Sequence, residues 1–109
     1  MKFRLFIDDE RFPSGIWRED EWVIARDYEA ACQAVKQRGM PTDISFDHDL
    51  GEGPTGADFA DWLIGCMLNK NWKFPKGFDY YVHSQNPVGA ANIRGKMDAA
   101  LKHIGYDEA

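Results

Sequence analysis

The chain has 109 residues, of which 44% are hydrophobic and 14% aromatic, enough for the core of one domain. Its formal net charge is −5 and it has no run of Lys and Arg, which argues against duplex DNA as a partner. No apolar stretch approaches the roughly 20 residues of a membrane span, and no signal-peptide pattern opens the chain. The two cysteines, Cys32 and Cys66, fall within helical patterns, as reduced thiols would. We expect one cytoplasmic domain over residues 1–109.

The first part of the chain predicts two strands and a helix. Residues 2–7 (KFRLFI) are short and apolar and end at an acidic pair, as a buried central strand would. Residues 10–21 contain Pro and Gly and predict an irregular link, and residues 21–26 (EWVIAR) predict the second strand. A helix is expected over residues 28–38, because Asp27 can cap it and apolar residues recur at helical spacing.

The second part predicts two more strands, each followed by a helix. Residues 43–49 begin as an apolar strand and end in two acids and a histidine, after which glycines release the chain. The next helix starts at residue 56 or 57, with Thr55 as a candidate cap. Residues 78–84 (FDYYVHS) predict the fourth strand, and the Asn-Pro pair at residues 86–87 starts the last helix.

This alternation of strands and helices predicts an α/β fold with a four-stranded parallel sheet. Right-handed crossovers between parallel strands restrict the topology. From the alternating pattern and the polar residues at the strand ends, we expect the strand order 2-1-3-4, with helices on both faces of the sheet. Ligand sites of such sheets lie at the carboxyl ends of the strands. Chemically capable side chains follow three of the predicted strands, so the sequence predicts a functional site at that edge.

Four aspartates follow the first and third predicted strands: Asp8, Asp9, Asp47 and Asp49. Carboxylates from adjacent strand ends are hard oxygen ligands and suit Mg²⁺, or Mn²⁺ as an alternative. The other interpretation is that each is a separate solvated turn residue. Because an acidic pair at one strand end coincides with the Asp-His-Asp run at another, we favour a metal or phosphate site.

Two of the three histidines, His48 and His83, lie at strand ends that are expected to face the same edge. An imidazole can donate or accept a proton near neutrality, or bind a metal. The alternative for each is an ordinary hydrogen-bonded loop histidine. We predict that His48, between two aspartates, is a general acid, and that His83, with mostly apolar neighbours, is a base or a metal ligand. His103 is expected at the surface.

The start of the last predicted helix is a candidate phosphate site. Free N–H groups and the helix dipole can hold an anionic oxygen near Asn86, and Gly89 would let a ligand approach closely. The simpler interpretation is an N-cap, with which anion binding is compatible. Arg11 follows the acidic pair and can either reach a phosphate or pair with Asp9.

These motifs resemble the receiver domain of response regulators. The carriers of the likeness are the acidic pair after the first strand, the Asp-x-x-Leu run from Asp47 to Leu50, and Ser84 at the end of the fourth strand. The resemblance implies a flavodoxin-like fold in which the acidic pair helps to bind Mg²⁺. It also implies that Asp47 occupies the phosphoacceptor position and that the Ser84 hydroxyl contacts the phosphate. The fifth strand, its preceding lysine and the final helix of that family have no counterpart in the sequence.

A closer resemblance is to the cyclic-phosphate-processing receiver-like family, which occurs in bacteria and phages. It is carried by three segments that together span most of the chain: LFIDDER-x-P at 5–13, SFDHDLG at 45–51 and VHS-x-NPVG-x-x-N at 82–92. The likeness implies action on cyclic phosphates, in RNA repair or nucleotide signalling. It also adds Asn92 to the candidate phosphate-binding residues, which are Arg11, Ser84, Asn86, Gly89 and Asn92.

The sequence therefore predicts a metal-assisted phosphoesterase that acts on a cyclic phosphate of a nucleotide or RNA end. In it, Asp47, His48 and His83 would be catalytic. The alternatives are a single-domain phosphoacceptor that uses Asp47, and a module that binds a phosphorylated ligand without turnover. The expected partner is a small phosphorylated ligand or an RNA terminus, with no membrane or duplex DNA. The sequence identifies no protein partner.

Overall fold

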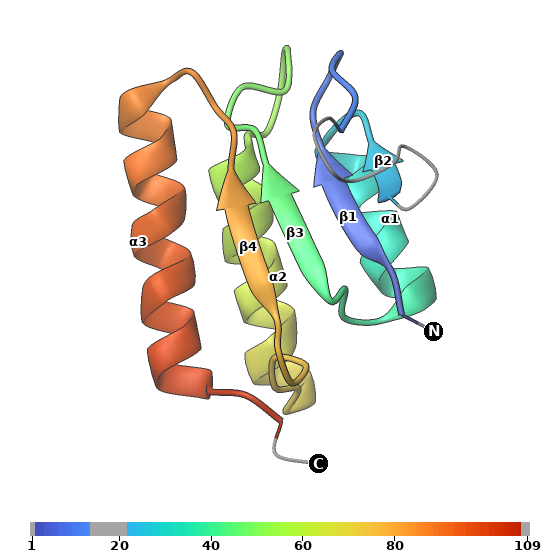
Figure 1. Ribbon diagram of the computed structural model, residues 1–109, viewed down its shortest axis with the longest axis vertical. Helices are drawn as coiled ribbons and strands as arrows, with labels where there is room; N and C mark the ends of the chain where they lie inside the picture. The colour runs from blue at the N-terminus through green and yellow to red at the C-terminus, as the bar shows by residue number, and fades with distance from the viewer. Residues whose placement is uncertain (1, 14–21, 108–109) are drawn as a thin grey trace.

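The computed structural model of the chain describes residues 2–13 and 22–107 (Figure 1). Its elements, in chain order, are β1 (Arg4–Ile7), β2 (Trp22–Ala25), α1 (Tyr28–Arg38), β3 (Asp43–Phe46), α2 (Gly56–Lys70), β4 (Asp79–Val82) and α3 (Pro87–Ile104). All strand pairs are parallel and the order is β2-β1-β3-β4, which confirms the predicted sheet. Most of the expected link at 10–21, residues 14–21, lies outside the described residues.

The helices begin where their capping residues predicted. Asp27 accepts a hydrogen bond from the backbone N–H of Ala30 at the start of α1. Thr55 caps α2 in a reciprocal capping box with Asp58, and Asn86 accepts from the N–H of Gly89 at the start of α3. These short-range bonds satisfy amides that the first helical turn leaves without a partner, which is why local sequence was enough to locate them.

We expected helices on both faces of the sheet, but the buried side chains of the described helices all pack against one face. In Figure 1, α1 and α2 lie behind the strands and α3 lies to the left of β4. The face that carries Leu5, Ile7, Ile44 and Phe46 forms one core with buried side chains of α1, α2 and α3. The reason is the handedness of the connections. The β2-to-β3 and β3-to-β4 crossovers run in the same direction across the sheet, so right-handed turns place both helices on the same side. The β1-to-β2 connection, which runs the other way, includes residues outside the described part.

The opposite face of the sheet carries the alternate side chains of the same strands. Phe6 and Trp22 are buried there and meet edge to face, with ring centroids 5.9 Å apart. Ser45, the partner of Phe6 in the β1–β3 register, is buried on the same face. This face therefore carries both buried apolar side chains and a buried polar one.

Within the described chain, no helix combines the length and apolarity that a membrane span requires.

Candidate functional site

Three side chains that are distant in sequence meet at the carboxyl edge of the sheet: Asp8 after β1, Asp47 after β3 and His83 after β4. Backbone hydrogen bonds extend the strand pairing past the strand ends and fix these positions. The N–H of Asp47 donates to the carbonyl of Ile7 (2.9 Å), and the N–H of His83 donates to that of Phe46 (3.0 Å). One potential ligand atom from each of the three side chains lies within 4.8 Å of the other two.

Asp8 is fully buried and is held by four donors. Its Oδ1 accepts from the backbone N–H groups of Glu10 and Arg11, both at 2.9 Å. Its Oδ2 lies 2.9 Å from Nε2 of His83 and 3.0 Å from Nε of Arg11. Burial by itself raises the pKa of this carboxyl group, but the hydrogen bonds and the guanidinium outweigh it and the pKa is lowered. Asp8 is therefore an ionised carboxylate at neutral pH.

The guanidinium of Arg11 lies between two carboxylates. Besides its contact with Asp8, its terminal nitrogen is 3.5 Å from Oδ2 of Asp47. Arg26 stabilises the turn after β1, because its side chain donates to the backbone carbonyl oxygens of Arg11 (2.6 Å) and Asp8 (3.3 Å). Among the described residues, Arg11 thus pairs with Asp8 and Asp47. The sequence had suggested Asp9 as its partner. Its side chain is 42% exposed, so it can leave this position without unpacking the core.

His83 uses both ring nitrogens. Nε2 contacts Asp8, Nδ1 lies 2.7 Å from the hydroxyl oxygen of Ser45, and the ring stacks on Phe6 at 4.6 Å. Because ionised Asp8 can only accept, Nε2 carries the proton and Nδ1 accepts from Ser45. Burial disfavours the imidazolium and lowers the pKa of His83, although Asp8 acts in the opposite direction. The neutral ring thus has no nitrogen free to act as a base in this arrangement.

His48 is held differently. Its Nδ1 lies 3.0 Å from Oδ1 of Asp49, whose other oxygen accepts from the side-chain amide of Asn86 at 3.4 Å. The hydrogen bond from His48 lowers the pKa of Asp49. The ring also lies against Gly89, where an added Cβ would be 2.3 Å from Cγ of His48. Within residues 2–13 and 22–107, no partner contacts Nε2, which leaves that nitrogen for proton transfer.

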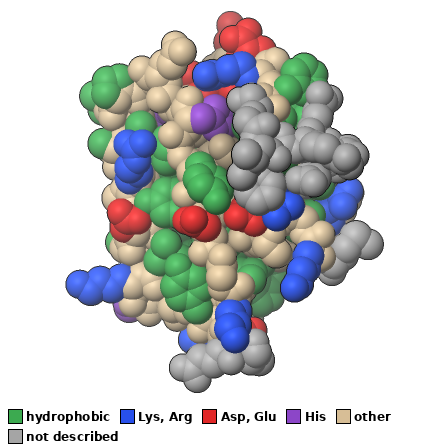
Figure 2. Space-filling view, viewed as in Figure 1, with side chains coloured by type: hydrophobic (Ala, Val, Ile, Leu, Met, Phe, Trp, Pro, Cys, Tyr) green, Lys and Arg blue, Asp and Glu red, His purple; other side chains and the backbone are tan. Residues whose placement is uncertain are grey.

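A cavity of about 480 Å³ opens beside these groups. Its lining comprises Asp9, Glu10, Arg11, Asp47, Asp49, Gln85, Asn86 and Pro87. Figure 2 shows acidic, basic and histidine side chains gathered at the corresponding end of the molecule. The structure thus brings Asp8 and Asp47 together, while exposed Asp9 and Asp49 line the cavity. Of the candidate phosphate ligands, Arg11 and Asn86 also line it.

The remaining phosphate candidates have other surroundings. The Ser84 hydroxyl accepts from the N–H of Asn86 at 3.1 Å and so stabilises the turn before α3. Gly89 is buried under His48, and Asn92 is exposed on α3 outside the cavity lining. Sequence reasoning missed Ser45, the partner of His83. Its signal was available, because strand alternation and register place Ser45 on the same face as Phe6.

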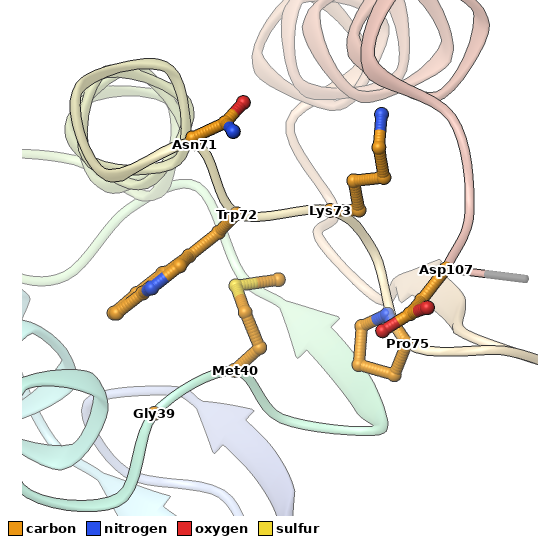
Figure 3. A pocket seen from close by; sticks show the side chains of 7 residues that line it. All are labelled: Gly39, Met40, Asn71, Trp72, Lys73, Pro75 and Asp107. Carbon is orange, nitrogen blue, oxygen red and sulfur yellow. The ribbon is translucent and has the colours of Figure 1, made fainter. Parts of the chain in front are cut away.

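A second cavity, of about 530 Å³, lies at the amino-terminal edge of the sheet (Figure 3). Its lining comprises Gly39, Met40, Asn71, Trp72, Lys73, Pro75 and Asp107. None of these was a candidate site residue, and only one carboxylate and one ammonium group are present. The chemically capable groups therefore concentrate at the carboxyl edge, where open α/β sheets place their ligands.

The half-buried His83 makes the stability of the metal-free protein depend on pH. Its folded pKa is below the unfolded value of about 6.5, so the unfolded chain binds more protons as the pH falls through 6.5. The free energy of unfolding is therefore expected to decrease from pH 7.5 to pH 5.5. Urea unfolding in EDTA measures it, and His83→Gln should flatten this part of the profile. His103→Ala, on the exposed end of α3, is the control; a profile equally flattened by that variant would contradict the assignment to His83.

The geometry agrees with comparisons of the whole chain. No curated protein and no solved structure matches the sequence. The model of one protein family, described as the cyclic-phosphate processing receiver domain, matches residues 3–99. That match includes all four strands and the whole carboxyl edge with Asp8, Asp47 and His83. Together with the parallel sheet of order 2-1-3-4, it shows that the chain belongs to the cyclic-phosphate processing receiver domain family.

Proposed function

We propose that this domain is a phosphoesterase that hydrolyses a cyclic phosphate of a nucleotide or RNA end with the help of a divalent cation. The observation that carries the proposal is the pair of buried carboxylates, Asp8 and Asp47, which converge on one cationic group beside an open cavity. The family match supports the cyclic-phosphate chemistry. The reaction type rests on the side chains around the cavity.

The charge of the cavity favours a cation. Its lining has four carboxylates, of Asp9, Glu10, Asp47 and Asp49, and one guanidinium, of Arg11. A phosphate would be repelled by this surplus of negative charge unless a cation offset it. Carboxylate oxygens are the ligands that Mg²⁺ and Mn²⁺ prefer, and the guanidinium between Asp8 and Asp47 already shows that a positive charge fits there. When bound, such a cation would polarise the phosphoryl group.

The protein's own groups would hold the phosphate and transfer protons. Once displaced from Asp8 and Asp47, the half-exposed Arg11 can bind a non-bridging oxygen, and the amide of Asn86 offers a second donor at the cavity wall. Water attacks phosphorus and gives up a proton, one ester P–O bond breaks, and the departing oxygen takes a proton. We assign the donated proton to Nε2 of the His48 imidazolium, because the carboxylate of Asp49 accepts from Nδ1 and a neutral ring in that contact carries no proton on Nε2. The ring then takes up the proton that the attacking water releases.

A screen of 2′,3′-cyclic and 3′,5′-cyclic nucleotides with Mg²⁺ or Mn²⁺ tests the proposal. Hydrolysis that requires the metal and is lost in Asp47→Asn would support it. Incubation with acetyl phosphate and Mg²⁺ tests the alternative of a phosphoacceptor, for which intact-protein mass should rise by one phosphate at Asp47. Saturable binding of a cyclic nucleotide without hydrolysis would instead identify a binding module, and would count against the enzyme.

A divalent cation is expected to raise the thermal midpoint. A ligand at 100 times its Kd adds about 2.7 kcal/mol to the stability of a one-site protein. For a domain of this size, that corresponds to a rise of roughly 10 °C. Differential scanning fluorimetry with millimolar Mg²⁺ or Mn²⁺ measures it, and Asp47→Asn should lose most of the rise. Asp61→Asn, which removes an exposed carboxylate paired with Lys96, is the control and should keep it. An unchanged wild-type midpoint would exclude a metal site of useful affinity.

A further inference from the structure

The hydroxyl group of Ser45 can form a hydrogen bond with His83 whether Nδ1 of the ring is protonated or not. Ser45 is buried, with 7% of its surface exposed, and its oxygen is 2.7 Å from Nδ1 of His83. A hydroxyl group can both donate and accept a hydrogen bond, whereas the carboxylate of Asp8 on the other ring nitrogen can only accept. The two contacts therefore differ in what they permit: Asp8 fixes a proton on Nε2, and Ser45 accommodates either form of Nδ1.

His83 is also oriented toward the two buried carboxylates. One of its ring nitrogens lies within 4.8 Å of carboxylate oxygens of both Asp8 and Asp47, and Nε2 is the nitrogen that contacts Asp8, at 2.9 Å. The ring is fixed by its neighbours, since it stacks on Phe6 with an interplanar angle of 5°. His83 would therefore not have to reorient its ring to bind a metal, which is the property of a ligand in a preorganised site. In the arrangement described, a metal can bind only after the guanidinium of Arg11 leaves the two carboxylates and the proton leaves Nε2.

We propose that Ser45 is a positioning residue that allows Nε2 of His83 to become the third protein ligand of the cation, so that the site selects first-row transition metals such as Mn²⁺ or Zn²⁺ over Mg²⁺. Binding at Nε2 moves the ring proton to Nδ1, from which it is donated to Ser45, and the Ser45 hydroxyl changes from donor to acceptor. The ring carries one proton before and after, so the change is a tautomer exchange. The inference rests on the proposed function only for the presence of a cation at Asp8 and Asp47.

The donor set determines the expected metal class. Two carboxylates alone suit Mg²⁺, which keeps several waters and seldom takes nitrogen ligands. An imidazole in the third position favours the transition metals and Zn²⁺. A histidine ligand commonly donates its other N–H to a neighbouring acceptor, and loss of that acceptor typically weakens metal affinity 10- to 100-fold. Ser45 is that acceptor here, at the back of the ring and away from the cavity lining.

The first test uses wild-type protein labelled with ¹⁵N-histidine. Ring nitrogen shifts distinguish a protonated from an unprotonated nitrogen, and Zn²⁺ is a diamagnetic probe. Metal-free protein in EDTA should show His83 protonated on Nε2, and one equivalent of Zn²⁺ should move the proton to Nδ1. If Zn²⁺ binds while the His83 nitrogens keep their metal-free shifts, His83 is not a ligand and the proposal is wrong.

The second test measures Mn²⁺ affinity from the EPR signal of the free ion. Ser45→Ala should weaken binding 10- to 100-fold, whereas Ser45→Thr, which keeps the hydroxyl group, should stay within a few-fold of wild type. Thr42→Val removes a half-buried hydroxyl group at the other end of β3 and should leave the affinity unchanged. Equal affinities for Ser45→Ala and wild type would overturn the role of Ser45.

Selectivity is tested with His83→Gln, which offers an amide oxygen in place of nitrogen. The ratio of Mn²⁺ to Mg²⁺ affinity, measured by competition, should fall at least tenfold, because only the softer metal loses a preferred ligand. An unchanged ratio would refute the predicted metal class. Neither binding test contains a substrate, so absence of cyclic-phosphate hydrolysis would contradict the proposed function and leave these results intact. Conversely, an active enzyme with equal affinity for both metals would contradict only the present inference.

Discussion

Replacing His48 with alanine is expected to reduce hydrolysis of the cyclic-phosphate substrate identified by the screen by about 10²- to 10⁴-fold, the usual effect of losing a general acid or base. The structure gives His48 the features of that role. Asp49 holds Nδ1 at 3.0 Å, and both chain neighbours of His48, Asp47 and Asp49, line the cavity. The His48 side chain itself is 17% exposed and is not part of that lining. Steady-state kinetics should show the loss in kcat, with KM changed much less, because His48 makes no predicted contact with the bound phosphate.

Two further variants make this result specific. His103→Ala removes an exposed histidine from the end of α3 and should keep full activity. Asp49→Asn keeps the size of the side chain and removes its charge, so it should reduce kcat by less than His48→Ala. If His48→Ala retains wild-type kcat on a verified substrate, the proton does not come from this histidine, and the cation with its bound water must supply it.

The sequence predicted the parts of the fold that depend on local rules. The caps at Asp27, Thr55 and Asn86 and the apolar strand at the start of residues 43–49 are properties of short segments, and the structure confirms them. The error concerned the placement of the helices, which depends on the direction of each crossover. The predicted strand order already contained that information, because two successive crossovers in the same direction place their helices on one face.

For the candidate site, the sequence was enough to predict which edge of the sheet its residues share. Strand ends located Asp8, Asp47 and His83, since carboxyl ends of parallel strands meet. The sequence could not predict which carboxylates Arg11 pairs with. The direction of its side chain depends on a turn, and the geometry of that turn is set by contacts of the Arg11 backbone with Asp8 and Arg26. The distinct environments of the two histidines likewise depend on tertiary neighbours.

Alanine substitutions at the two glycines of α3 distinguish an effect on the position of the His48 ring from an effect on protein stability. Gly89 and Gly95 lie on the same helix, but only Gly89 faces another side chain. An ideal Cβ at Gly89 would lie 2.3 Å from Cγ and 2.6 Å from Nδ1 of His48, whereas at Gly95 nothing lies within 4 Å. The atom in conflict, Nδ1, is the one that pairs with Asp49. A methyl group at Gly89 would therefore act directly on the orientation of the proposed acid.

Gly89→Ala is accordingly expected to displace the His48 ring, break its pair with Asp49 and reduce kcat by roughly 10²-fold, similar to loss of the acid itself. Overpacking should cost about 1–3 kcal/mol of stability. Gly95→Ala should leave kcat unchanged and raise stability by about 0.5–1 kcal/mol, since alanine favours an exposed helix interior. Kinetics and urea unfolding of both variants measure these effects. If Gly89→Ala loses stability as predicted but keeps wild-type kcat, the orientation of His48 does not limit the reaction, and the general-acid assignment fails with it.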